Sequence, residues 1–134
     1  MQKRVFIIHG WDGHPEEGWF PWLKKELESK GFAVFVPQLP KAEEPRIKNW
    51  VPKLKKAVGA PDEQTYVVGH SLGCQTIARY LEELPEGATV GGAVFVAGYF
   101  TRLSGLEDDD TVQSVAKEWL ETPLNLEKVK THLK

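Results

Sequence analysis

An α/β fold built on a mostly parallel sheet is predicted by two observations. Short apolar runs rich in Val, Ile and Phe are typical of strands that are buried on both faces. Along the 134-residue chain they alternate with longer segments in which apolar residues recur every three or four positions, the spacing of one helix face. Because parallel strands need crossover connections, this alternation predicts a three-layer α/β/α architecture with helices on both faces of the sheet.

Four strands are expected, at residues 4–8, 33–36, 65–68 and 93–96. Pro37 stops the second strand, and Gly98 follows the fourth. We expect the ligand site of such a sheet beyond the carboxyl ends of its strands.

Helices are expected between and after these strands. Trp19, Trp22, Leu23 and Leu27 mark the first, which Gly31 ends. Further helical patterns cover residues 46–58, 74–84, 111–120 and 126–133. In the 46–58 helix, Pro52 must lie in the first turn, with Asn49 as a candidate cap, or kink the helix.

Composition limits the classes of partner. A net charge of −2 gives no reason to expect nucleic acid or an anionic membrane. The single cysteine, Cys74, allows no intrachain disulfide and fits the reducing cytoplasm. No apolar run approaches the length of a membrane span. We therefore expect one domain over residues 1–134, located in the cytoplasm.

The main candidate site is the motif Gly69-His70-Ser71-Leu72-Gly73, which follows one expected strand and precedes one expected helix. G-x-S-x-G in this setting indicates a serine nucleophile on a strained turn, whereas the alternative is a tight turn with an incidental serine. The N–H of Leu72 is one candidate oxyanion donor. A second is expected from the glycine-rich loop at residues 9–13, first from Trp11 N–H and next from Asp12 N–H.

No histidine is an evident general base. His70 lies beside the serine in the motif and is expected to point away from it, and His9 is expected to brace the oxyanion loop. His14 lies on an expected exposed loop and is a weak candidate for a substitute base. His132 is expected on the surface. The histidines also lack the paired spacing of metal ligands, so no metal is expected.

Two other groups of residues have more than one interpretation. Asp108, Asp109 and Asp110 most simply cap the following helix, although a catalytic acid among them is an alternative. Trp11, Tyr99 and Phe100 are candidate walls of an acyl pocket, with ordinary core packing as the alternative.

The chain resembles the small α/β-hydrolases of the YdeN and retinoblastoma-binding-protein-9 type. The matching pieces are residues 5–10, 19–22, 45–50, 67–74, which contain GHSLGC, and 93–98. The resemblance implies an esterase-like serine hydrolase that acts without a cofactor on small esters or related acyl compounds. Ser71 would be the nucleophile, and the backbone of Trp11 and Leu72 the oxyanion hole. Supporting positions would be His9, Gly10, Gly69, His70 and Gly73.

The chain departs from that family in its catalytic triad. The family's acid and base follow a fifth and a sixth strand, and no matching Asp or His loop precedes Lys134. We therefore expect the fold to lack its last two strands and the chain to be C-terminally incomplete and nearly inactive alone. The alternative is a hydrolase-derived binding or scaffold protein. A bare edge at residues 93–96 predicts self-association or complementation by a separate fragment.

Overall fold

A four-stranded parallel sheet forms the centre of the structure, a computed structural model that describes residues 2–100, 106 and 108–134. The strands lie in the order β2-β1-β3-β4, and every neighbouring pair is parallel. Their bounds are β1 (Arg4–Ile8), β2 (Ala33–Phe35), β3 (Thr65–His70) and β4 (Gly92–Val96). All four predicted strands are present within two residues of their expected bounds, which confirms the α/β prediction.

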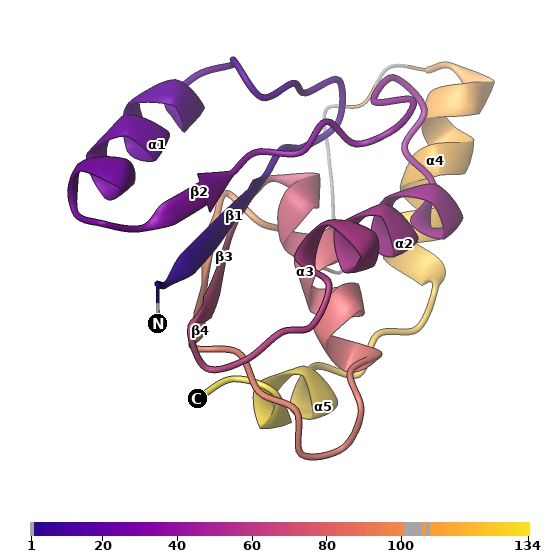
Figure 1. The fold of residues 1–134 in the computed structure, drawn as a ribbon. Coiled ribbons are helices and arrows are strands. Elements are labelled where there is room, and N and C mark those ends of the chain that lie inside the picture. Colours follow the sequence, from indigo (N-terminus) through magenta and orange to yellow (C-terminus); the bar gives the residue numbers. More distant parts are fainter. Residues whose placement is uncertain (1, 101–105, 107) are drawn as a thin grey trace.

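Helices cover both faces of this sheet (Figure 1). Within the described residues, one face carries a single helix, α1 (Phe20–Ser29). The opposite face carries α2 (Ile47–Val58), α3 (Leu72–Glu82), α4 (Asp110–Glu121) and α5 (Leu126–Thr131). The predicted three-layer arrangement is therefore confirmed, with most of the helical mass on one side.

The alternation of side chains along β1 divides the core into two clusters. Phe6 and Ile8 belong to the larger cluster, with the side chains of α2 and α3. Val5 and Ile7 belong to the smaller cluster, beneath α1. This division follows from strand geometry, because successive side chains point to opposite faces of a sheet.

Two local expectations were wrong. Of the two alternatives for Pro52, the first-turn position with Asn49 as the cap is wrong, because α2 begins at Ile47 after Arg46 and contains both residues, with Pro52 beyond its first turn. His132 is buried, with 3% of its surface exposed, and its Nδ1 lies 2.7 Å from the carbonyl oxygen of Ala88. The sequence pattern missed this because the short helix α5 packs on the rest of the core rather than lying in solvent.

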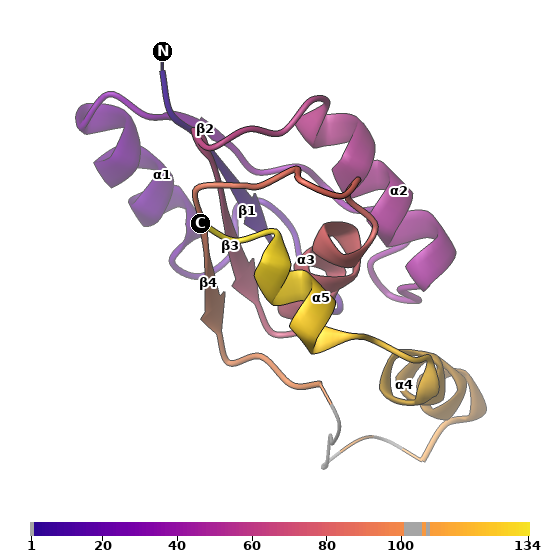
Figure 2. The same ribbon diagram turned by 90° about the horizontal axis from the view of Figure 1, so that it is seen from below.

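The chain end lies beside the segment that enters β4 (Figure 2). Leu133 forms a parallel bridge with Val90, and the N–H of Lys134 donates to the Val90 carbonyl at 3.1 Å. Along Gly92–Val96 itself, the described residues provide a partner strand on one side only, which is β3. The outer edge of β4 is therefore open within the described part of the chain.

Candidate active site

Ser71 lies at the turn between β3 and α3, where it is the residue before the first helical turn. Its backbone has φ 54° and ψ −120°, in the left-handed half of conformational space that residues other than glycine rarely occupy. Such a conformation is strained and persists only where the surroundings hold it. The turn lies at the carboxyl end of β3, the edge at which parallel sheets bind their ligands.

Glycines allow three segments to meet at this turn. A Cβ atom added to Gly73 would lie 2.2 Å from the carbonyl oxygen of Ile8, so the start of α3 rests directly on the end of β1. A Cβ atom on Gly10 would lie 3.0 Å from the Cβ of Ser71 and 3.4 Å from the N atom of Leu72. The loop after β1 is therefore packed against the serine turn.

The same loop is braced by His9, which is fully buried. Its Nδ1 lies 2.9 Å from the carbonyl oxygen of Gly10, and its Nε2 accepts the N–H of Leu39 at 2.9 Å. These partners place the proton on Nδ1, which donates to Gly10. Burial lowers the pKa of His9, against a smaller opposing effect of the Gly10 hydrogen bond, so the ring is held neutral.

The backbone N–H groups that the sequence offered as oxyanion donors differ in whether they already have an acceptor. Leu72 opens α3, so its N–H has no intrahelical acceptor and lies at the positive end of the helix. Within the described residues, the N–H of Trp11 makes no hydrogen bond, whereas that of Asp12 donates to the Ala42 carbonyl at 2.8 Å. Asp12, the second-choice donor from sequence, is therefore already engaged.

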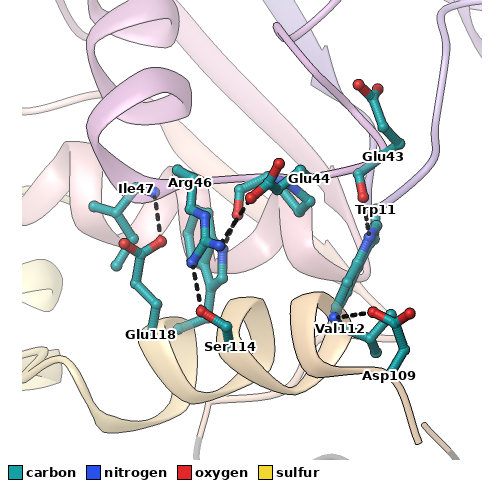
Figure 3. A network of polar contacts seen from close by, with 11 residues as sticks. Trp11, Glu43, Glu44, Arg46, Ile47, Asp109, Val112, Ser114 and Glu118 are labelled. Carbon is teal, nitrogen blue, oxygen red and sulfur yellow. Dashed lines mark hydrogen bonds and ion pairs between the residues drawn. The ribbon is translucent and has the colours of Figure 1, made fainter. Parts of the chain in front are cut away.

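A polar network fixes the surroundings of Trp11 (Figure 3). The indole N–H of Trp11 donates to the Glu43 carbonyl at 3.1 Å. Arg46, three residues further along, contacts Glu44 at 3.0 Å and Ser114 of α4 at 3.3 Å. The loop before α2 thereby connects the Trp11 side chain to α4.

The end of β4 is joined to the serine turn through its backbone. The N–H of Ser71 donates to the Val96 carbonyl at 2.9 Å, and the chain then turns at Ala97, which has a positive φ of 53°. Tyr99 was expected as a pocket wall or a core residue, and it is partly buried and packs against the larger core cluster.

None of the four histidines, all of which are described, is hydrogen-bonded to Ser71. The ring of His70 lies edge-on to Trp19 and Phe20, on the face that carries α1. His14 is exposed, and its Nδ1 accepts the N–H of Glu16.

Asp109 and Cys74, which the sequence also offered for consideration, have structural roles. The Asp109 carboxylate caps α4 by accepting the N–H of Val112 at 3.1 Å. Burial raises the pKa of Cys74 to about 11, so its side chain is a neutral thiol at ordinary pH. Among the described residues, no group of three His, Cys, Asp or Glu side chains could hold a metal ion. No helix in the described part of the chain is both long and apolar enough to cross a membrane.

Comparison with known proteins finds a family model and relatives that are all described as hydrolases. The family model described as Serine hydrolase matches residues 5–128. YdeN of Bacillus subtilis (strain 168) is 38% identical over 107 residues, which are 80% of this chain and 56% of that protein. The serine hydrolase RBBP9 of Rattus norvegicus is 33% identical over 66 residues, or 48% of this chain and 35% of that protein. The chain thus spans little more than half the length of YdeN.

Solved structures agree with the fold. The crystal structure of the ydeN gene product from B. subtilis superposes with a TM-score of 0.85 at 33% identity, over 98% of this chain and 67% of that one. A monoacylglycerol lipase of Paleococcus ferrophilus has a TM-score of 0.63 at 21% identity, over 78% of this chain and 42% of that one. At 21% identity, the similarity to this lipase is evidence for a shared fold only. The match over residues 5–128, together with the G-x-S-x-G turn at the end of β3, shows that the chain belongs to the serine hydrolase family and has an α/β-hydrolase fold.

Proposed function

We propose that the chain is the nucleophile-bearing part of a serine hydrolase that acts on small esters or related acyl compounds, with Ser71 as the nucleophile. The observation that carries the proposal is the strained backbone of Ser71 at the end of β3, with the loop at Gly10 packed within contact distance of its Cβ atom. Strain at one non-glycine residue between a strand and a helix is the arrangement that exposes a nucleophilic hydroxyl.

In the proposed reaction, Ser71 Oγ forms a bond to the acyl carbon and loses its proton to a base. The carbonyl oxygen becomes negative and accepts hydrogen bonds from the N–H groups of Leu72 and Trp11. These donors are fixed before the reaction, by the start of α3 and by the loop that His9 braces. Preorganised donors of this kind stabilise the charge that develops in the transition state. The alcohol then leaves, and water hydrolyses the acyl-serine.

The base is the missing element of the proposal. A serine hydroxyl is a weak nucleophile without a neighbouring group that takes its proton. The described histidines all lack a hydrogen bond to Ser71, and the nitrogen atoms of His9 are occupied. We therefore propose that the chain alone reacts slowly, at a rate owed to the oxyanion donors and to binding. Removing triad groups typically costs a factor on the order of 10⁴ or more.

A fluorophosphonate probe tests the nucleophile directly, because it forms a phosphorus–oxygen bond with an activated serine and releases fluoride. We expect slow labelling of the chain at Ser71 and none in Ser71→Ala. Ser29→Ala is the matched control, since Ser29 is exposed at the end of α1 and donates to the Glu26 carbonyl. Peptide mass spectrometry identifies the labelled residue.

Absence of labelling in the unaltered chain would instead support the alternative, a hydrolase-derived binding or scaffold protein. A substitute base at His14 is a weaker reading, and it fails if His14→Ala labels as fast as the unaltered chain. The proposed compartment is the cytoplasm, on the ground that the one cysteine is a buried free thiol. The proposed partner is a small acyl compound rather than nucleic acid or a membrane, given the net charge of −2.

A further inference from the structure

Three of the five tryptophans of the chain donate their indole N–H to carbonyl oxygens of one short loop, at residues 40–45. The donors come from separate parts of the chain: Trp11 from the loop after β1, Trp50 from α2 and Trp119 from α4. The indole has a single polar atom, which usually finds a partner when it is buried. Because three of these atoms find it on one loop, the loop connects all three parts. We call it the junction loop.

Both ends of the junction loop are held by helices. The Trp50 indole donates to the carbonyl oxygen of Pro40 at 2.8 Å, and the Trp119 indole donates to the carbonyl oxygen of Pro45 at 3.0 Å. Both rings are almost fully buried and lie edge-on to each other, with 6.0 Å between their centroids. Proline itself restricts the backbone, so the loop has little freedom at these two points. α2 and α4 therefore fix where the junction loop lies.

Between its ends, the junction loop holds the loop after β1 through two successive carbonyl groups. The N–H of Asp12 donates to the Ala42 carbonyl at 2.8 Å, and the indole N–H of Trp11 donates to the Glu43 carbonyl at 3.1 Å (Figure 3). Asp12 and Lys41 have positive φ values of 59° and 47°. Strained residues of this kind persist only where their surroundings hold them, and they concentrate at functional sites.

The held loop lies against the serine turn. A Cβ atom on Gly10, the residue before Trp11, would lie 3.0 Å from the Cβ of Ser71. Within the described part of the chain, the backbone N–H of Trp11 makes no hydrogen bond, whereas its indole N–H and the N–H of Asp12 are both engaged. The junction loop thus holds Trp11 by its side chain and leaves its backbone N–H available to a ligand.

We propose that the junction loop positions the oxyanion hole, with the side chains of Trp11, Trp50 and Trp119 as its positioning residues. These side chains act without touching the reacting atoms. By holding the Trp11 indole at Glu43, the loop keeps the Trp11 backbone N–H directed at the negative oxygen that forms during acyl transfer. Donors that are fixed before the reaction stabilise its transition state. The proposal rests on the proposed function, since it concerns the oxyanion donors of the Ser71 reaction.

Exchange of one atom in the indole tests this proposal. Trp11→3-benzothienylalanine keeps the shape of the ring but has sulfur in place of the N–H, so only the hydrogen bond to Glu43 is lost. We expect the maximal rate of fluorophosphonate labelling at Ser71 to fall about fivefold, the value of one hydrogen bond. In that reaction Ser71 Oγ forms a bond to phosphorus, the serine proton passes to the buffer, and fluoride leaves with the phosphorus–fluorine electron pair. The probe concentration at half-maximal rate should stay unchanged.

A thiophosphonate form of the probe distinguishes positioning from a merely structural role. Its P=S sulfur accepts hydrogen bonds more weakly than the P=O oxygen, so its reaction depends less on the oxyanion donors. We expect Trp11→3-benzothienylalanine to slow the P=O probe about fivefold and the P=S probe less than about twofold. Partial unfolding would slow both probes equally. The ratio of the two rates therefore reports the oxyanion donors even if the variant folds poorly.

Two further variants test the anchoring and provide the control. Trp119→3-benzothienylalanine releases one end of the junction loop and leaves Trp11 unaltered. It should shift the ratio of the two rates in the same direction by about twofold, because the lost bond acts through the loop. Trp22→3-benzothienylalanine is the matched control, since Trp22 is 63% exposed on α1. Its ratio should equal that of the unaltered chain.

The outcomes separate this proposal from the proposed function. If the unaltered chain labels at Ser71 and the Trp11 variant leaves the ratio unchanged, the positioning role is wrong and the role of Ser71 stands. If only the Trp119 variant leaves it unchanged, the assignment of Trp119 as a positioning residue is wrong. If the unaltered chain does not label at all, the nucleophile is wrong and the positioning role fails with it. A Trp11 variant that only binds the probe more weakly would assign the Trp11 ring to the pocket wall instead.

Discussion

The two faces of the sheet differ in how completely helices cover them. On the face of α2 and α3, the side chains of Phe6, Ile8 and Val67 are almost fully buried. On the face of α1, a groove of about 450 Å³ runs beside the helix, lined mainly by apolar side chains of α1, β1, β3 and β4. Val94 in this groove is 56% exposed. We call these the sealed face and the open face.

At the edge strand β4 both faces are less well covered, since Phe95 lies on the sealed face with Val67 and is 38% exposed. A buried strand pattern therefore does not guarantee burial. β4 carries the same kind of apolar run as β1, yet its side chains at Val94, Phe95 and Val96 are all exposed. Apolar burial stabilises by about 25 cal/mol per Å² removed from water. We infer that most of the stability of the described chain comes from the sealed face, and that the open face is the more available for contacts.

The largest expected effect is a difference between two matched Leu→Ala substitutions. Leu54 is fully buried on the sealed face, whereas Leu23 is half-buried beside the groove. We expect Leu54→Ala to lower the free energy of unfolding by about 3 kcal/mol, from lost transfer energy plus a cavity. Leu23→Ala should cost less than half as much, because its side chain is already partly exposed. Urea unfolding followed by circular dichroism measures both, and equal losses would refute the distinction between the faces.

A smaller effect than the one on unfolding is expected on the self-association of the chain through β4. The open edge of β4 and the adjacent groove present unpaired backbone groups beside apolar side chains, which invites pairing with a second copy of the chain. Two copies paired antiparallel through β4 would form a closed, two-fold interface. We expect Val94→Lys to weaken this association about tenfold or more, since burying an unpaired ammonium group is costly.

Sedimentation over a range of concentrations measures that association. Trp22→Lys is the control, because Trp22 is 63% exposed on α1 and does not line the groove. It should associate as the unaltered chain does. A chain that sediments as a monomer at every concentration, with no binding of an apolar dye, would show that the open face does not drive pairing.

The smallest expected effect is a pH dependence of the free energy of unfolding, caused by the buried residue His9. Burial lowers the pKa of His9 below its ordinary value of about 6.5. As the pH falls below about 6.5, the unfolded chain binds a proton that the folded chain does not, so the free energy of unfolding decreases until the pH reaches the folded pKa. Above this window the contribution is constant.

Unfolding titrations between pH 7.5 and 5.5 measure this slope. His9→Gln should be less stable at pH 7.5, because it loses the pairing with Gly10 and Leu39, but its stability should vary less with pH. If the free energy of unfolding of His9→Gln varies with pH as steeply as that of the unaltered chain, groups other than His9 cause the pH dependence.

The elements near Ser71 were predictable because their signals are local. The apolar runs predicted β1 and β3, and the glycines around Ser71 predicted the sharp turn between β3 and α3. The capping of α4 by Asp109 follows from the same local logic. The burial of His132 and the hydrogen bond from the Ser71 N–H to the Val96 carbonyl were not predictable in this way. Each depends on residues that lie far apart in the sequence.

The sequence by itself determined the parallel α/β fold and the serine turn, because strand runs, helix periodicity and glycine positions act over a few residues. Only the tertiary structure decided which groups surround Ser71. It occupied both nitrogens of His9, engaged the N–H of Asp12, and joined the N–H of Ser71 to the Val96 carbonyl. The tertiary structure also left Val94, Phe95 and Val96 of β4 exposed. These outcomes depend on how separate elements pack against each other, which no single stretch of sequence encodes.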